Sequence, residues 1–516
     1  MDCVFPAWTH VLNQDDFWER HIALATMDSL ANGPEPSNAS SSLATVSRLT
    51  RGDELELVID KFADRGQCIG RVGNKVVLVP RVLPGERIRV RVMKNQNRFV
   101  RSEPLAILEP SLQRVLPRCR YFGICGGCTL QHVSYEAQLE AKRESVRSAL
   151  VHHGGLHELE VRSPVAAQTP YFYRNKMEFS FAARRWLSPE EIASGRKFNT
   201  DFALGLHPSG IFHKVLDLHE CHLQSECSVA LVNGVRTFTR NAGWRPWDAR
   251  THEGYLRHLV IRESAHEASV MVNLVTFGHD AERMSALGDF LQAEYPHVTT
   301  LVNTINTSHA QTAWGESAVT VFGPGRIRDR IGALVFEIGP GDFFQTNTRQ
   351  AEALVDVVRA MASLQPSNYV YDLYCGTGTM ALSLAGQAAR ITGVELIESA
   401  VESARTNAKL NGITNCTFVA GDMLKILTPG FVTAHGPCDV LILDPPRAGL
   451  HPKVATRVAT LGAQRIVYVS CNPRSQARDL NILAGTYRPV LAQPVDLFPQ
   501  TYHVENVVLL EQRTDT

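Results

Sequence analysis

The sequence lacks an excess of either charge, because 52 lysines and arginines balance 52 aspartates and glutamates among its 516 residues. A nucleic-acid partner would therefore have to be held by a local basic surface rather than by net charge. The sequence also lacks a continuous apolar run long enough to span a bilayer. Its first ten residues lack the basic and then apolar plan of a secretory signal. We expect a cytoplasmic protein without a membrane segment.

The eleven cysteines are not expected to form a disulfide framework, because no secretory signal precedes them. We therefore interpret each cysteine separately, as a metal ligand, a nucleophile or a core residue. The chain is too long for a single hydrophobic core, and its length indicates about three folded domains.

The texture of the sequence predicts four parts. Residues 1–50 are rich in Ser, Asn, Pro and Ala, which is typical of a flexible tail. Residues 51–110 hold short strand-like runs between turns, which predict a small OB-like β-barrel. Residues 111–340 mix strands and helices, so we expect a middle α+β domain. Residues 341–516 alternate apolar strands with helices, which predicts a doubly wound α/β domain around a parallel sheet.

Within the predicted barrel, the segment ERIRVRVM (86–93) alternates arginines with apolar residues. The period of two places Arg87, Arg89 and Arg91 on one face of a strand. A solvated strand face and an RNA-binding platform explain this pattern about equally well.

The segment YDLYCGTGT (371–379) predicts a strand that turns through glycines into a nucleotide-binding site, and Thr379 at its end is a predicted cofactor contact. Gly376 and Gly378 allow a tight turn and a close approach of a ligand to the backbone. This spacing alone is weak evidence. A nicotinamide dinucleotide would require a third glycine at the helix start, where the sequence has Met380 and Ala381 instead.

Acidic residues end the three strands that follow. Glu395 can bind both hydroxyls of a ribose, Asp422 can reach an adenine edge, and Asp444 lies above the point where ligands bind in such sheets. Three acids at one edge suit S-adenosylmethionine, which carries a cationic sulfonium and no phosphate. We therefore predict a methyltransferase domain that uses this cofactor.

Cys471 ends the strand-like run RIVYVSCNP (465–473) in the same domain. A free cysteine is most often a small buried core residue. A thiol at a strand end above a nucleotide cofactor can instead be a nucleophile. The residues around Cys471 alone do not decide between the two.

Three further cysteines, Cys119, Cys125 and Cys128, form a C-x5-C-x2-C cluster with glycines between the last two. Thiols so close together in a chain without disulfides indicate metal ligation. A set of four thiolates suits zinc and iron–sulfur clusters alike. His132 and His222 are near enough in sequence to serve as zinc ligands.

Three segments together carry a family resemblance: LDPPRAGL (443–450), VSCNP (469–473) and HVENVVLLE (503–511). In their order and spacing they resemble the RNA uracil-5 methyltransferases that act on transfer and ribosomal RNA. The resemblance extends over residues 51–510, and the three segments are far more specific together than singly.

The resemblance implies a role for individual residues. Cys471 corresponds to the nucleophile, Glu505 to the general base and Asp444 to the acid of the DPPR motif. The cofactor contacts that it implies are Gln345 in GDFFQTN, Tyr374 and Glu395.

The chemistry of uracil methylation explains these residue types. Uracil C5 is too poor a nucleophile to attack a sulfonium methyl group, but addition of a thiolate at C6 converts the ring into an enolate. A base must then remove the C5 proton so that the thiolate can leave. We expect burial to raise the pKa of Glu505 and Arg447 to favour the thiolate of Cys471.

Two related chemistries are disfavoured by position 447 and its neighbours. Amino methyltransferases commonly carry an aromatic residue after the two prolines, and position 447 is arginine. RNA cytosine-5 enzymes carry an additional cysteine in this motif, which LDPPR lacks. Cys438 lies at the opposite end of the strand. Uracil is therefore favoured over cytosine.

The resemblance also implies a [4Fe–4S] cluster held by the three clustered cysteines and Cys221. Cys227 is the alternative fourth ligand, and zinc is the alternative metal. We expect the cluster to be structural.

The segment VIDKFADRGQCIGR (58–71) resembles a TRAM domain, an RNA-binding module, and YRNKMEFSF (173–181) also resembles a family segment. We therefore expect RNA contacts from Arg174 and Lys176 as well as from the barrel arginines. Barrel and cluster together favour 23S ribosomal RNA over transfer RNA as the substrate of a monomeric enzyme. An inert RNA-binding assembly factor and an iron–sulfur redox protein are the alternatives from other classes.

Overall fold

The computed structural model describes residues 49–211 and 213–513. The predicted tail, residues 1–50, lies almost entirely outside these residues. The described chain forms two compact units, one of residues up to 117 with 129–134, and one of residues 118–128 with 135 onward. Each unit is considered by itself. No helix among the described residues is long and apolar enough to cross a membrane.

The first unit contains a closed five-stranded barrel in the order β1-β2-β3-β5-β4. Alternate residues of each strand point inward, so that Ile88, Val90 and Val92 are buried while their neighbours face outward. The predicted small β-barrel is thereby confirmed. Its strands are β1 (Glu54–Phe62), β2 (Gln67–Val72), β3 (Lys75–Pro80), β4 (Arg87–Asn95) and β5 (Phe99–Glu109).

The outer face of β4 carries the three predicted arginines, and each forms an ion pair with a glutamate of a neighbouring strand. These pairs are Arg87–Glu109, Arg89–Glu56 and Arg91–Glu54, with N–O distances of 2.8, 3.0 and 2.9 Å. The glutamates offset much of the positive charge that the sequence places on this face. An RNA contact by these arginines stays a prediction.

The second unit begins with a seven-stranded sheet in the order β13-β12-β11-β10-β7-β8-β9. Helices α4 (Glu226–Asn241) and α5 (Ala281–Glu294) cover one of its faces, where they share a hydrophobic core with the strands. The strands are β7 (Lys176–Ala182), β8 (Ala203–Leu206), β9 (Leu216–Asp217), β10 (Leu256–Glu263), β11 (Val270–Thr276), β12 (Thr300–Ile305) and β13 (Ser317–Phe322), and the short helix α3 (Pro189–Ala193) lies between β7 and β8.

A hairpin of β14 (Ile327–Ile331) and β15 (Leu334–Ile338) leads from this sheet into an eight-stranded sheet in the order β18-β17-β16-β19-β20-β22-β21-β6. The first five strands are parallel, whereas β22 pairs antiparallel with both β20 and β21. The strands are β6 (Glu160–Val161), β16 (Tyr369–Leu373), β17 (Arg390–Glu395), β18 (Cys416–Ala420), β19 (Val440–Leu443), β20 (Arg465–Ser470), β21 (Tyr487–Val495) and β22 (Glu505–Gln512).

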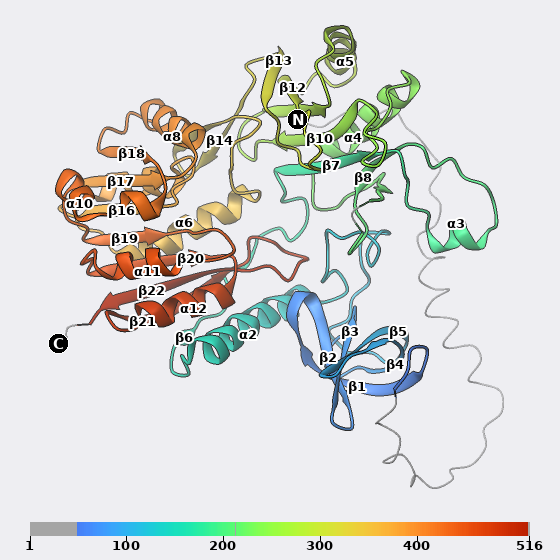
Figure 1. The fold of residues 1–516 in the computed structure, drawn as a ribbon, viewed down its shortest axis with the longest axis horizontal. Helices are drawn as coiled ribbons and strands as arrows, with labels where there is room; N and C mark the ends of the chain where they lie inside the picture. The colour runs from blue at the N-terminus through green and yellow to red at the C-terminus, as the bar shows by residue number, and fades with distance from the viewer. Residues whose placement is uncertain (1–48, 212, 514–516) are drawn as a thin grey trace. The chain divides into compact units, whose positions relative to one another are not determined.

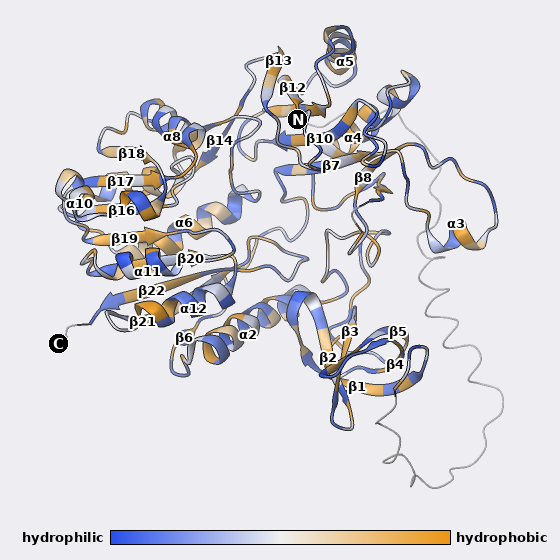
Figure 2. Cartoon of the chain, viewed as in Figure 1, coloured by the Kyte–Doolittle hydropathy of each residue, from blue (hydrophilic) through white to orange (hydrophobic). Residues whose placement is uncertain are grey.

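Helices cover both faces of this sheet (Figure 1), and each face has its own hydrophobic core. Apolar residues are concentrated in the strands between them (Figure 2). The predicted doubly wound α/β fold is confirmed. One core includes α6 (Thr348–Ala362), α7 (Thr379–Leu384) and α8 (Glu398–Leu410); the other includes α2 (Tyr135–Gly154), α9 (Met423–Ile426), α10 (Pro429–His435), α11 (Pro452–Ala459) and α12 (Pro473–Leu483).

Helix α2 and strand β6 fall inside the predicted middle domain, residues 111–340. In the structure, however, β6 is a strand of the eight-stranded sheet and α2 packs against that sheet. β6 pairs with β21, and Val146 and Leu150 of α2 contribute to the core shared with α11 and α12. The boundaries of the predicted domains stay predictions. The pairing of β6 with β21 could not be predicted, because about 330 residues separate the two strands in the sequence.

One face of α2 is polar and yet buried. Gln138 and Lys142 are each about 1% exposed, and both contact the loop between β21 and β22. The Lys142 ammonium donates to Asp496 at 2.5 Å and to the Phe498 carbonyl at 3.0 Å. Tyr135, one turn before Gln138, donates its hydroxyl to the same aspartate at 2.9 Å.

Gln138 holds the strained residue of this loop. Gln500 has a left-handed backbone with φ of 66°, a conformation that a side chain other than glycine disfavours. Its N–H donates to the Gln138 carboxamide oxygen at 3.0 Å, and its own carboxamide oxygen accepts from Gln138 at 3.1 Å. These contacts fix the loop that ends at Glu505.

The buried ion pair predicts the effect of one substitution. Replacing Lys142 with Met leaves the Asp496 carboxylate buried without its cation, and we expect the free energy of unfolding to fall by about 3–5 kcal/mol. The control is Arg147→Met, whose pair with Glu144 is more than half exposed, and which should cost at most about 1 kcal/mol. Urea denaturation measures both, and equal losses would contradict a clamping role for Lys142.

Candidate active site

The chain leaves a space for a ligand where β16 ends. Tyr374 follows the strand in a left-handed conformation, with φ of 67°. Gly376 has φ of 54°, and a Cβ built on it would meet no atom within 4 Å. At Gly378 a Cβ would lie 3.1 Å from Ala404 and from Phe418. Glycine is favoured at 378 by the positive φ of 84° and by these close neighbours, and at 376 it leaves the backbone open to a ligand.

The predicted acids lie at the same edge of the sheet. Glu395 is the last residue of β17, and its carboxylate accepts the N–H groups of Gly376, Leu396 and Ile397 at 3.2, 2.7 and 3.0 Å. Asp422 follows β18 and caps the start of α9. These bonds hold the Glu395 carboxylate beside the glycine turn, where it can accept from a ribose.

The surroundings of this turn fit S-adenosylmethionine. Leu396 and Ile397 are 64% and 56% exposed, so apolar surface lies uncovered directly after the acid that would bind the ribose. An adenine ring has the flat apolar faces that suit such a surface. The open backbone at Gly376 and the carboxylate of Glu395 suit the rest of a nucleoside without phosphates.

The loop that carries Gln345 lies against the glycine turn, because the Thr377 hydroxyl donates to the Phe343 carbonyl at 3.4 Å. Asn175 fixes this loop: its side-chain amide donates to the Gln345 carbonyl at 2.8 Å, and its N–H donates to Thr346 at 2.9 Å. The last predicted cofactor residue, Thr379, begins α7 directly after the turn.

The antiparallel pairing of β20 with β22 brings the predicted nucleophile and base together. Ser470 pairs with Asn506 in the register of the two strands. Cys471 follows Ser470 and Glu505 precedes Asn506, so continuing the register by one residue sets the thiol opposite the carboxyl group. Residues 34 positions apart in sequence therefore meet at one end of the sheet.

Burial favours the protonated forms of Glu505 and Asp444. It raises the pKa of Glu505 well above its usual range, and the nearby Asp444 raises it further. Burial likewise raises the pKa of Asp444 to about 7. The expected direction for Glu505 is thus confirmed, although its role is not tested by this shift.

The pKa of the Cys471 thiol departs from expectation. Burial raises its pKa to about 11, and Glu505 adds to this increase. Arg447 acts in the expected direction, because its guanidinium donates to the sulfur and lowers the pKa, but burial outweighs it. The expectation that the surroundings favour the thiolate is therefore wrong for the protein without RNA, because the sequence shows the arginine but not the burial.

The clustered cysteines lie in one loop of the second unit. Within residues 49–211 and 213–513, no three His, Cys, Asp or Glu side chains are arranged to hold a metal ion. Three of the predicted ligands are nevertheless neighbours, because Cys119 interacts electrostatically with Cys125 and Cys221. The Nε2 of His222 lies 3.8 Å from a carboxylate oxygen of Glu220.

Segment 171–175 joins the cysteine loop to the predicted active site. Its Phe172 and Arg174 N–H groups each donate at 2.8 Å to carbonyls of residues 222–223. The hydroxyl of Tyr173 donates to the Pro499 carbonyl, at 3.0 Å. Burial lowers the pKa of Lys176 and of His503, and the charge of Arg174 contributes to both shifts. Arg174 therefore lies near Lys176 and near the end of the loop between β21 and β22.

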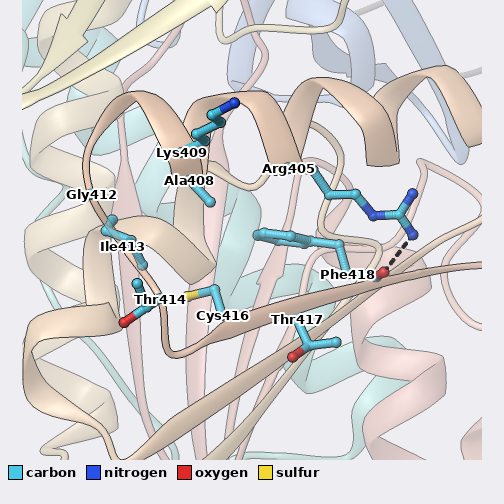
Figure 3. Close-up of a pocket in the computed structure, with 9 residues that line it drawn as sticks. All are labelled: Arg405, Ala408, Lys409, Gly412, Ile413, Thr414, Cys416, Thr417 and Phe418. Carbon is cyan, nitrogen blue, oxygen red and sulfur yellow. Dashed lines mark hydrogen bonds between the residues drawn. The ribbon is translucent and has the colours of Figure 1, made fainter.

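A surface pocket lies elsewhere, beside the edge strand β18 (Figure 3). Arg405 and Lys409 of α8 line it together with residues 412–414 and 416–418, and Arg405 donates to the Phe418 carbonyl at 2.9 Å. It lies at the beginning of β18, whereas the predicted acids lie at the ends of the strands. None of the predicted site residues lines it.

Comparison with known proteins agrees with this geometry. Residues 326–513 match the family model described as tRNA (Uracil-5-)-methyltransferase, and residues 48–105 match that of the TRAM domain. An uncharacterized RNA methyltransferase of Chlorobaculum tepidum is 42% identical over 90% of this chain and 98% of its own. One of Porphyromonas gingivalis is 41% identical over 89% of this chain and all of its own. The chain belongs to the RNA uracil-5 methyltransferase family.

A solved structure of the family has the same fold over most of the chain. The tRNA (uracil-54, C5)-methyltransferase of Pyrococcus abyssi, in complex with S-adenosyl-L-homocysteine, is 29% identical, with a TM-score of 0.68 over 88% of this chain and 99% of its own. The protein is thus an S-adenosylmethionine-dependent RNA methyltransferase with an N-terminal TRAM barrel.

The structure adds residues to this uracil-5 methyltransferase site that the sequence did not reveal. His503 contacts Arg447, and its presence in HVENVVLLE was the only available signal. Gln138, Lys142 and Asp372 gave none, because their partners are distant in sequence or are backbone groups.

Asp372 is a buried acid beside the glycine turn, and its protonation state can be tested. Its Oδ2 accepts the Ala381 N–H at 2.9 Å, and its Oδ1 has no hydrogen-bond partner among the described residues. Burial raises its pKa to about 8, and Asp444 raises it further. In the folded protein this acid therefore keeps a proton that the unfolded chain loses above about pH 4.

We expect Asp372 to make the folded state lose stability as pH rises. The unfolding free energy of the wild type, minus that of Asp372→Asn, should fall from pH 5 to pH 8, by at most about 1.4 kcal/mol per pH unit. The control is Asp356→Asn, because Asp356 is 72% exposed. Urea titrations at each pH measure the difference, and a difference that rises with pH would contradict the buried neutral acid.

Proposed function

We propose that this protein methylates C5 of a specific uridine in 23S ribosomal RNA through a covalent bond between Cys471 and C6 of the base. Glu505 is the general base in this proposal, and Asp444 is the acid beside them. The carrying observation is the strand pairing that sets Cys471 opposite Glu505, with both next to the strand ends that fit the cofactor.

The proposed reaction assigns a step to each group. The sulfur of Cys471 loses its proton to solvent and bonds to C6, while the C5–C6 double bond becomes part of an enolate. S-adenosylmethionine supplies the methyl group, which bonds to C5 as its bond to sulfur breaks. Glu505, as the carboxylate, removes the C5 proton, the C6–sulfur bond breaks, and the thiolate leaves.

The raised pKa values agree with these roles once a substrate is bound. A base with a raised pKa removes a proton more effectively than an ordinary carboxylate. The target uracil has to leave its stack to reach Cys471 at the end of β20. Arg447 is a cation that favours the thiolate in the site.

The choice of RNA rests on different observations. The TRAM barrel together with the cysteine loop supports ribosomal RNA, because bacterial transfer-RNA members of the family commonly lack both. Transfer RNA is the second candidate, which the Pyrococcus abyssi enzyme favours. Arg174 and Lys176 are proposed to contact the RNA in either case, since Arg174 lies near both Lys176 and His503.

The covalent step is tested with 5-fluorouridine, which has no proton at C5 that Glu505 could remove. We expect wild-type protein with S-adenosylmethionine to form a stable adduct with a 5-fluorouridine transcript of 23S RNA, and Cys471→Ala to form none. Denaturing gels and mass mapping detect it. The control is Cys438→Ala, a buried thiol at the opposite end of β19. An adduct with transfer RNA alone would overturn the choice of RNA, and no adduct would overturn the mechanism.

We also propose that Cys119, Cys125, Cys128 and Cys221 hold a [4Fe–4S] cluster with a structural role. Three of these thiols accept a backbone N–H two residues further along the chain, namely those of Tyr121, Gly127 and Leu223. Such N–H groups stabilise metal-bound thiolates, and their repetition supports ligation. The electrostatic contact of Cys221 with Cys119 and Cys125 supports Cys221 as the fourth ligand.

Metal analysis of anaerobically purified protein tests this set. We expect about four iron atoms and four sulfides per chain, their loss in Cys221→Ser, and their retention in Cys227→Ser, the matched control. Stoichiometric zinc in a colourless protein would overturn the cluster. Loss of metal from Cys227→Ser instead of Cys221→Ser would overturn the ligand set.

A further inference from the structure

The Arg447 guanidinium donates to the Cys471 sulfur and is itself held by His503. Arg447 lies on the loop after β19 and is exposed. Its carbonyl accepts from the Asn472 amide and the Ser475 hydroxyl, both at 3.0 Å, so its backbone is fixed against the start of α12. These bonds do not restrain the long side chain, which has several rotatable bonds and would lose that freedom on being fixed.

His503 restrains the guanidinium. One Arg447 Nη lies 2.6 Å from the Nδ1 of His503 and 3.5 Å from its Nε2. Arginine only donates hydrogen bonds, so the Nδ1 must offer a lone pair and the ring must be neutral with its proton on Nε2. The ring is itself held by Tyr502, with ring centroids 4.1 Å apart. The His503 N–H also donates to Thr501, at 3.2 Å.

The surroundings keep this imidazole neutral. Burial and three cations, Arg447, Lys142 and Arg174, together lower the pKa of His503 to about 4. Lys142 comes from α2 and Arg174 from segment 171–175, so the charges that lower this pKa come from three separate elements. The acceptor at Nδ1 is therefore maintained at the pH of a cell.

We propose that His503 is a positioning residue, which holds the Arg447 guanidinium against the sulfur of Cys471 through its Nδ1 acceptor. Without that acceptor the guanidinium is free to turn to solvent or to the neighbouring acids, and the thiol loses a cation that lowers its pKa. The groups that face the thiol are Arg447, Glu505 and Asp444. The inference rests on the proposed nucleophile, and its test separates the two.

Two substitutions test whether the acceptor for Arg447 must lie at the place of the His503 Nδ1 or at that of its Nε2. The side-chain oxygen of Asn can occupy the place of the histidine Nδ1, whereas that of Gln reaches the place of Nε2. His503→Asn should therefore retain the contact with Arg447, while His503→Gln and His503→Ala lose it. An exposed histidine of α2, replaced as His152→Ala, serves as the matched control.

The first measurement needs no RNA. Iodoacetamide alkylation of Cys471, followed by mass spectrometry of its peptide from pH 7 to pH 11, reports the thiolate fraction. We expect the apparent pKa of the thiol to rise in His503→Gln and His503→Ala, with alkylation at pH 8 reduced about tenfold, and to stay near the wild-type value in His503→Asn and His152→Ala. Identical profiles in all variants would overturn the proposal, as would equal effects of Asn and Gln.

The second measurement follows adduct formation with the 5-fluorouridine transcript under single-turnover conditions. The rate should fall about tenfold in His503→Gln and recover most of its value in His503→Asn. If wild-type protein forms no adduct, the covalent mechanism fails while the alkylation profiles still decide whether His503 positions Arg447. If adducts form equally fast in Gln and Asn variants, the mechanism stands and the positioning role fails.

Discussion

The antiparallel pairing of β22 with β20 is the constraint on which the site depends. The first five strands of the sheet are parallel and deliver the cofactor residues to one edge, as in other doubly wound folds. A base from a further parallel strand would arrive only after a crossover connection. Because β22 runs the other way, its first residue, Glu505, lies opposite Cys471, and both neighbour the cofactor edge.

The pairing fixes where Glu505 lies but not the conformation of the loop that leads to it. That task falls on buried polar groups, which are costly unless each is paired. Lys142 and Gln138 of α2 form hydrogen bonds with polar groups of this loop. Tyr173 and Asn347 donate to the carbonyls of Pro499 and Leu497. A left-handed residue and a buried ion pair so close to a reactive site indicate that geometry is maintained here at a cost in stability.

The same loop connects three parts of the second unit. Segment 171–175 lies between the loop that leads to Glu505 and the cysteine loop. Its Asn175 donates to the carbonyl of Gln345, in the loop beside the glycine turn. A metal bound by the cysteines would stiffen one end of this segment. In the proposed mechanism, a structural metal therefore acts by fixing the surroundings of the catalytic loop, without taking part in the chemistry.

Much of the fold could be predicted from the sequence, because its signals are local. Alternation of residues such as Arg87 and Ile88 revealed the barrel, and apolar strands ending at Glu395 and Asp422 revealed the α/β sheet. The ion pairs of the barrel arginines could not be predicted, since cross-strand partners depend on register.

The candidate site was predicted in its residue types but not in its electrostatics. Cys471, Glu505 and Asp444 stand in recognisable motifs, so the sequence was enough to nominate them. The pKa of Cys471 depends mainly on burial, and no local sequence pattern records that. The clamp by Lys142 was hidden for the same reason, because its place in an amphipathic helix resembles a solvated position.

The central claim is that Cys471 and Glu505 act on opposite sides of one covalent intermediate. The most direct test is Glu505→Gln incubated with S-adenosylmethionine and an unmodified 23S RNA transcript, followed by digestion and mass spectrometry. The account predicts that the Cys471 peptide carries a uridine with an added methyl group, because the C5 proton cannot be removed and the thiolate cannot leave. Free 5-methyluridine formed at the wild-type rate, or a methylated adduct on any other residue, would contradict it.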